Sequence, residues 1–291
     1  MPNRVAATLA PRDTDQALAL LTELAPQIGY AEVRLDLMES FDLPRLIDGS
    51  PSPLIITCRP QREGGRFAGP EPERLAILRQ AARLGCAYID IEWDSVAELP
   101  SLALGRTCAM VSRHWYDRMP ADLWSHYTAL REHADVVKLV GLAQRPADLG
   151  PVLDLLWRAE SPVVAIAMGA EGMISRLLAP CAASCLLTYG AATADSTTAA
   201  GQLSIHEMTE TYQLQAAGPH THIHLHLCAD PERAAAVVAR NAGETPGALL
   251  HVPLVITPDN IAYLVPALAA LPRLLLIAEA ELQVALDRAT R

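Results

Sequence analysis

The sequence is poor in aromatic residues and has no long unbroken apolar run. Aromatic residues make up 4% of the chain and hydrophobic residues 51%, so the core must consist mainly of Leu, Ala, Val and Ile, and disorder is excluded. The first residues include no apolar stretch long enough for a signal peptide. The most apolar late run is interrupted by Pro266, Pro272 and Arg273, which excludes a membrane span.

Positive charge and closely spaced cysteines are also scarce. The net charge of −10 disfavours binding to nucleic acid or to anionic membrane surfaces. The six cysteines show no CxxC spacing, and the nearest pair is Cys181 and Cys185, so we expect reduced cysteines. We therefore predict a cytoplasmic protein with neither a nucleic-acid nor a membrane partner. Its 291 residues allow a barrel of about 220 residues and a small additional unit.

Lysine is almost missing. Of the 23 basic residues, Lys138 is the one lysine and the others are arginines. Arginine serves as well as lysine on most solvated surfaces, but it cannot lose a proton near neutral pH and attack a carbonyl group. Lys138 is therefore a candidate for amine chemistry.

Short apolar runs alternate with longer amphipathic runs, which is typical of parallel strands joined by crossover helices. The expected strands are 5–9, 30–37, 54–59, 87–92, 107–112, 135–140, 162–168 and 184–188. The expected helices between them are 14–26, 71–84, 121–132, 146–159, 171–179 and 202–216. No Gly-x-Gly-x-x-Gly follows an early strand, which disfavours an open nucleotide-binding sheet.

Polar side chains alternate within three of the predicted strands. They are Glu32, Arg34 and Asp36 on the second strand, Thr57 and Arg59 on the third, and Asp90 and Glu92 on the fourth. Alternating residues point to one side of a strand, so in a closed barrel they line a shared pocket near the carboxyl ends. We therefore predict an α/β fold of the (β/α)₈ TIM barrel type. The alternative is an open sheet that contains buried salt bridges.

Lys138 lies in an apolar run with strand propensity. Burial disfavours the charged form of an amine, and a neutral amine that faces a carbonyl is the requirement for Schiff-base catalysis. The alternative is a structural ion pair with Asp36, Asp90 or Glu92.

His114 follows the fifth strand, where an imidazole could shuttle protons beside the amine. His126 and His133 lie on a predicted surface helix, so the position of His114 favours it as the general base. Glu63 follows the third strand and could orient that imidazole, and paired glycines beside it would let the loop approach a ligand. Arg176 follows a Gly-rich turn and offers a bidentate fork for a carboxylate.

Together these segments resemble the type I 3-dehydroquinate dehydratases over roughly residues 4–215. The motifs that carry the resemblance are Glu32-Val33-Arg34-Leu35-Asp36, Thr57-Cys58-Arg59, Glu63-Gly64-Gly65, Asp90-Ile91-Glu92, Ser112-Arg113-His114, Asp135-Val136-Val137-Lys138, Met168-Gly169 through Gly172 to Ser175-Arg176, and Gly201-Gln202. Two departures stand out, namely Trp115-Tyr116 after the histidine, and Thr198 at the serine position of a lid segment.

The resemblance implies a hydro-lyase that dehydrates 3-dehydroquinate in the shikimate or quinate pathway, by syn elimination through an imine on Lys138 and without a separate cofactor. It implies aromatic amino acid biosynthesis and a homodimer. The implied catalytic residues are Lys138, His114 and Glu63. The implied substrate-binding residues are Thr8, Glu32, Arg34, Arg59, Arg176, Thr198 and Gln202, supported by Asp36, Asp90 and Glu92.

The sequence changes character near Gly218, so we predict a barrel domain over residues 1–217 and a small α/β extension over 218–291. Three further strand–helix pairs are expected there, with strands at 221–228, 248–256 and 273–278 and helices at 232–241, 260–270 and 280–289. Residues 247–260 faintly resemble part of a shikimate dehydrogenase substrate domain. The extension is too short for that enzyme's two domains and lacks its catalytic lysine, so dehydrogenase activity is not expected.

Four histidines alternate in the extension: His220, His222, His224 and His226. Spacing of two puts their imidazoles on one face of a strand, where neighbours could share a transition metal. The favoured interpretation is a half-exposed edge strand without metal.

Alternative functions for the chain are a class I Schiff-base aldolase, a regulator that binds quinate-like ligands, and a metal-dependent hydrolase that uses the histidines.

Overall fold

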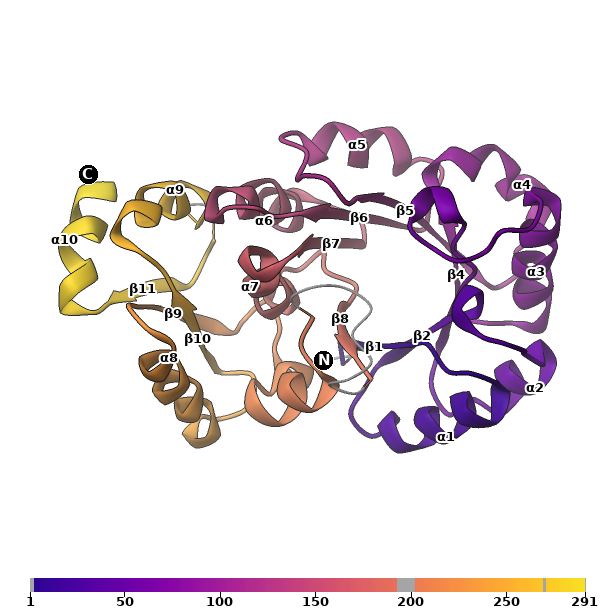
Figure 1. The fold of residues 1–291 in the computed structure, drawn as a ribbon, viewed down its shortest axis with the longest axis horizontal. Helices are drawn as coiled ribbons and strands as arrows, with labels where there is room; N and C mark the ends of the chain where they lie inside the picture. Colours follow the sequence, from indigo (N-terminus) through magenta and orange to yellow (C-terminus); the bar gives the residue numbers. More distant parts are fainter. Residues whose placement is uncertain (1–2, 193–201, 269–270, 291) are drawn as a thin grey trace.

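The computed structural model describes residues 3–192, 202–268 and 271–290. Its larger part is a ring of parallel strands surrounded by helices (Figure 1). The strands are β1 (Val5–Leu9), β2 (Tyr30–Arg34), β3 (Leu54–Thr57), β4 (Tyr88–Glu92), β5 (Cys108–Trp115), β6 (Val136–Leu142), β7 (Val163–Met168) and β8 (Thr188–Ala191). They pair in chain order, and β8 pairs with β1. An isolated bridge between Val163 and Cys185 links β7 to the chain before β8. The predicted (β/α)₈ barrel is confirmed.

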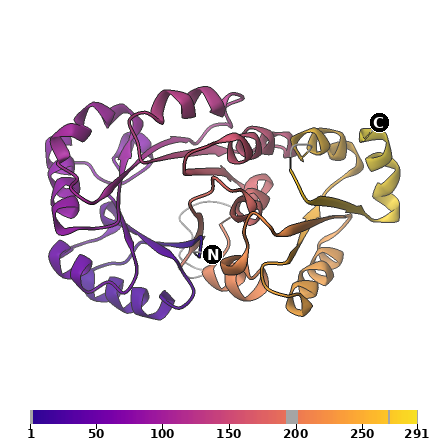
Figure 2. The ribbon, with the colours of Figure 1, turned by 180° about the vertical axis from the view of Figure 1, so that it is seen from behind.

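Helices cover the outside of the ring, as the view from behind in Figure 2 also shows. They are α1 (Thr14–Leu24), α2 (Leu43–Asp48), α3 (Glu71–Leu84), α4 (Leu99–Leu102), α5 (Leu123–Leu130), α6 (Leu149–Arg158) and α7 (Met173–Leu178). Asp13 and Asp122 cap α1 and α5, because each carboxylate accepts a hydrogen bond from a backbone N–H of the first turn. Every second strand residue points inward, so Ile55, Met110 and Val136 fill the barrel interior below the polar residues.

Several element bounds differ from the sequence prediction. Strand β2 ends at Arg34, and Asp36 lies in a 3₁₀ turn (Leu35–Leu37), where its carboxylate accepts hydrogen bonds from two backbone N–H groups. Strand β5 extends through His114 to Trp115, whereas β8 begins only at Thr188. The helix predicted at 202–216 forms only in part: residues 205–206 are helical and continue into a π-helical turn (Glu207–Thr211), and a separate 3₁₀ turn follows (Leu214–Ala216).

The C-terminal part forms a second, three-stranded parallel sheet. Its elements are β9 (His222–Cys228), α8 (Pro231–Val238), β10 (Leu249–Val255), α9 (Pro258–Leu268), β11 (Leu274–Ala278) and α10 (Ala280–Ala289). The strand order is β10-β9-β11, so the three expected strand–helix pairs are present. Helix α9 packs against barrel helix α6, which joins the two parts (Figure 1). Within the described residues, no helix combines the length and apolarity that a membrane crossing requires.

Strand β9 is the central strand of this sheet, so the edge-strand prediction is wrong. Ile223, Leu225 and Leu227 are buried on one face, as expected. On the other face exposure falls along the strand: His222 is exposed, His224 is half-buried and His226 is 4% exposed. His220 precedes the strand. The predicted domain boundary between residues 217 and 218 stays a prediction.

Candidate active site

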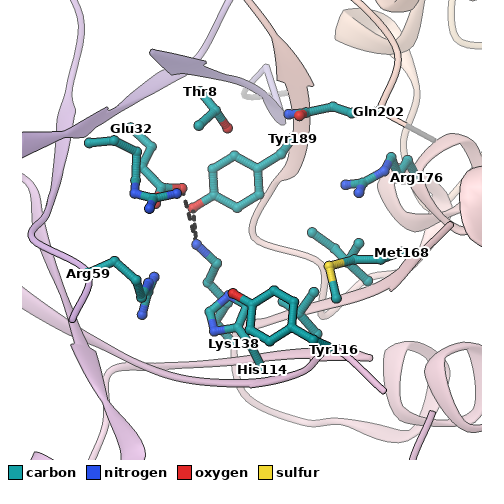
Figure 3. A pocket seen from close by; sticks show the side chains of 13 residues that line it. Thr8, Glu32, Arg59, His114, Tyr116, Lys138, Met168, Arg176, Tyr189 and Gln202 are labelled. Carbon is teal, nitrogen blue, oxygen red and sulfur yellow. Dashed lines mark hydrogen bonds and ion pairs between the residues drawn. The ribbon is translucent and has the colours of Figure 1, made fainter. Parts of the chain in front are cut away.

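The carboxyl ends of the barrel strands surround a polar cavity of about 550 Å³, including its open mouth (Figure 3). The predicted residues that line it are Thr8, Glu32, Arg34, Arg59, His114, Lys138, Arg176 and Gln202. The remaining lining consists of Tyr116, Val140, Ile166, Met168 and Tyr189. Asp36, Glu63, Asp90 and Glu92 contact these residues from behind. Thr198 lies outside the described residues.

Lys138 projects from β6 into the cavity, and 4% of the residue is exposed. Its Nζ lies 3.1 Å from Oε2 of Glu32 and 2.9 Å from Oδ2 of Asp90, and it donates a hydrogen bond to the hydroxyl of Tyr189 at 3.3 Å. The ion pair with Asp90 that the sequence offered as an alternative is thus present. These carboxylates stabilise an ammonium, so attack on a carbonyl requires that the amine first release a proton. The pairing positions the amine and leaves it facing the cavity.

A network of buried charges supports the lysine from below. Arg59 bridges two carboxylates, with one guanidinium nitrogen 2.7 Å from Asp90 and another 2.8 Å from Glu92. Burial alone would raise the pKa of Asp90, but Arg59 and Lys138 outweigh it and hold that pKa well below its usual value. Burial raises the pKa of Glu92 to about 7, although Arg59 and Arg74 lie beside it. Arg59 therefore orders Asp90, one of the two carboxylates that hold Lys138.

His114 and Glu63 form a carboxylate–imidazole pair at the cavity wall. Oε2 of Glu63 lies 3.3 Å from Nδ1 of His114 and accepts a hydrogen bond from the backbone N–H of the same residue at 3.0 Å. Trp93 donates to the other carboxylate oxygen at 3.1 Å. A carboxylate beside Nδ1 favours the tautomer with its proton there, so Nε2 keeps a lone pair. Burial, aided by Arg59, lowers the pKa of His114 to about 4, although the hydrogen bond that His114 donates to Glu63 opposes this shift.

The paired glycines after Glu63 make close contacts with the protein itself. A Cβ atom at Gly64, whose φ is +74°, would lie 2.5 Å from the ring of Tyr116, and one at Gly65 would lie 2.0 Å from the carbonyl oxygen of Arg59. The glycines thus allow the loop to fold over Arg59 and against Tyr116, which holds Glu63 in place. The predicted close approach of this loop to a ligand stays a prediction.

Arg176 points into the cavity from the side opposite Arg59 (Figure 3). It is 2% exposed, and its Nε has no hydrogen-bond partner among the described residues. Burial lowers the pKa of Arg176 to about 10. A buried guanidinium without an anionic partner is costly unless a ligand supplies the missing charge. Arg34 differs, because Asp36 pairs with it through two hydrogen bonds of 2.9 and 2.8 Å.

Sequence reasoning missed Tyr189, which contacts the amine directly. Besides the hydrogen bond, Nζ of Lys138 lies 4.4 Å from the centre of the Tyr189 ring. The predicted eighth strand ended at Thr188, one residue before Tyr189, so the side chain was not assigned to the barrel interior. Sequence reasoning also missed Tyr116, whose ring stacks on His114 with 5.9 Å between ring centres.

Fold and site together define an enzyme of the (β/α)₈-barrel class, with a lysine-centred polar site at the carboxyl ends of its strands. The family model for type I 3-dehydroquinase matches residues 5–219. The chain belongs to this family.

Curated relatives agree with that assignment, and solved structures share the fold. A bifunctional 3-dehydroquinate dehydratase/shikimate dehydrogenase of Arabidopsis thaliana is 31% identical over 225 residues, which is 73% of this chain and 37% of the relative. A 3-dehydroquinate dehydratase of Desulfotalea psychrophila is 36% identical over 188 residues, which is 61% of this chain and 83% of the relative. The structure of the Geobacillus kaustophilus 3-dehydroquinate dehydratase matches 72% of this chain and 92% of its own, with a TM-score of 0.63 and 21% identity.

The C-terminal sheet also has a structural counterpart. A dehydroquinate dehydratase and shikimate dehydrogenase structure from S. pombe matches 99% of this chain and 58% of its own, with a TM-score of 0.63 and 18% identity. The likeness in fold therefore extends beyond the barrel.

Proposed function

We propose that the chain dehydrates 3-dehydroquinate to 3-dehydroshikimate through an imine between the substrate ketone and Lys138. One observation carries the proposal: a buried amine, a histidine paired with a carboxylate, and a buried arginine with no ionic partner among the described residues face one cavity. Relatives named 3-dehydroquinate dehydratase align with the barrel, which supports the same substrate. Lys138 supplies the electron sink, so the reaction needs no separate cofactor.

In the first step Nζ of Lys138 releases a proton and adds to the C3 carbonyl carbon. The carbonyl oxygen then leaves as water, and an iminium forms. This cation occupies the place of the original ammonium, so Glu32 and Asp90, 3.1 and 2.9 Å from Nζ, would stabilise it in the same way. The same two buried carboxylates would thus stabilise both the ammonium and the iminium form of Nζ.

In the second step Nε2 of His114 takes the proton from C2. The electrons of the C–H bond move to the iminium nitrogen and give an enamine. The enamine then expels the C1 hydroxyl, which takes the proton back from His114 and leaves as water. Since one imidazole removes and returns the proton on one face, the elimination is syn. Hydrolysis of the remaining imine releases the product and restores the amine.

Arg176 would hold the substrate carboxylate, because a bidentate carboxylate satisfies a buried guanidinium. Glu32, Arg34, Arg59, Thr8, Gln202 and Thr198 would bind the ring hydroxyls. Val140, Ile166 and Met168 form an apolar wall that would face the ring and exclude water.

Reductive trapping tests the imine. Borohydride added with substrate should attach the ligand irreversibly to Lys138, which peptide mass spectrometry would locate, and should abolish dehydroshikimate formation measured by ultraviolet absorbance. Lys138→Arg keeps the charge but cannot form the imine, so it should remain unmodified. Normal turnover in a protein that borohydride never modifies would contradict the mechanism.

A further inference from the structure

Three histidines of the C-terminal sheet converge on one point. His224 and His226 lie on β9, and His251 lies on the neighbouring strand β10, directly opposite His224 in the parallel register. Their ligand nitrogens all lie within 4.8 Å of one another. His226 and His251 are buried, and His224 is half-buried. The cluster therefore joins residues from two neighbouring strands, and His224 is its partly exposed member.

The ring of His251 is held by its surroundings. Nε2 of His251 lies 3.2 Å from Oε1 of Glu244, and Nδ1 lies 2.8 Å from Nε2 of His226. Asn241 donates to the backbone carbonyl of His251 and accepts from its N–H, at 2.9 and 2.8 Å. A carboxylate on one ring nitrogen leaves a lone pair on the other, and metal-binding histidines commonly show this arrangement. The lone pair on Nδ1 points toward the other two imidazoles.

We propose that His224, His226 and His251 bind one divalent transition-metal ion of the zinc class. Three imidazoles suit such an ion, and tetrahedral ligands about 2.0–2.1 Å from zinc lie about 3.3 Å apart, which requires only small ring movements from the observed cluster. The proton now shared between His226 and His251 leaves when the ion binds. The fourth position faces solvent beside His224.

The ion would join β9 to β10. A sheet of three strands with three helices has a small core, and metal binding is a common source of stability in units of this size. The family match ends at residue 219, so the site lies outside the region that the proposed dehydratase function uses.

The test uses the full chain, freed of metal by a chelator and then titrated with Co²⁺ and, separately, Zn²⁺. We expect one equivalent to bind, with the intense visible absorption of tetrahedral cobalt and a calorimetric signal for zinc. His251→Ala and His224→Ala should lose this binding and keep dehydratase activity. His220→Ala is the matched control, because His220 is exposed, lies outside the cluster and should bind metal like the unchanged chain.

Glu244→Gln keeps the three ligands and weakens the orientation of His251, so it should lower the affinity about 10–100-fold. This variant also tests the site if an alanine variant fails to fold. Absence of stoichiometric binding in the unchanged chain, or equal loss in His220→Ala, would overturn the proposal.

Discussion

The barrel cavity and the histidine cluster bury polar side chains in different ways. In the barrel, buried cations and carboxylates alternate, as in Lys138 between Glu32 and Asp90, and the lysine sits inside a closed sheet. In the C-terminal sheet the buried groups are imidazoles that contact each other on one face of an open sheet. A charged, enclosed site suits an anionic substrate, whereas neighbouring imidazoles suit a cation. The two regions therefore suit the two kinds of chemistry that we propose for them.

The largest expected effect is at Lys138. Lys138→Ala should reduce kcat by more than about 10⁴-fold, because the covalent intermediate cannot form. It should also lower the melting temperature, since Glu32 and Asp90 lose their shared cation. Lys138→Arg should be equally inactive with a smaller stability loss. Dehydroshikimate absorbance and calorimetry measure the two effects, and an active Lys138→Arg variant would refute the role of the amine.

His114→Ala should lower kcat by about 10²–10⁴-fold, the usual contribution of a positioned acid–base group. Trapping with borohydride should still label Lys138, because imine formation precedes the proton transfer. His126→Ala is the control on helix α5 and should retain full turnover. If His114→Ala turns over normally, another residue is the base.

Arg176→Met should raise KM by about 10–10³-fold, because the charged hydrogen bonds to the substrate carboxylate are lost. The same change should raise the melting temperature, since it removes a buried guanidinium that has no ionic partner among the described residues. Arg34→Met, which breaks a paired arginine, should instead lower it. Steady-state kinetics and calorimetry would show whether the two variants differ in this way.

The pH profile should reflect the buried imidazole. His114 must be unprotonated to accept the C2 proton, and its pKa is lowered to about 4. Activity should therefore persist as the pH falls through 6.5, the ordinary value for histidine, and decline only near pH 4. A decline of kcat/KM centred near 6.5 would contradict this assignment.

The smallest effect on catalysis is expected in the second region. Asn241→Ala removes two buried hydrogen bonds to β10 and should destabilise the C-terminal sheet by about 1–3 kcal/mol. Metal binding should weaken because His251 loses its support, while kcat stays unchanged. A fall in kcat would show that the two regions are coupled.

The barrel and most residues that line its polar cavity could be predicted from the sequence. The polar motifs follow the predicted strands in order, and in a parallel barrel the carboxyl ends of the strands meet at one end. The sequence could not place Tyr189, since the apolar run before it gives no signal for where a strand begins. His251 was missed for a different reason: the partner of β9, and its register, depend on pairing between separate strands. Sequence reasoning placed His220 on the same strand face as His222, His224 and His226, although β9 begins only at His222. Alternation alone does not tell where a strand begins. The homodimer and the cytoplasmic location stay predictions.

The contact between α9 and α6 has a consequence for any shortened version of the chain. Helix α6 follows β6, the strand that carries Lys138, and a Cβ atom at Gly150 would lie only 3.6 Å from Ala267 of α9. Cutting the chain after the barrel would uncover this flank of α6 and expose an apolar patch next to the strand that carries Lys138. An isolated barrel would thus differ from the 291-residue chain in solubility as well as in size.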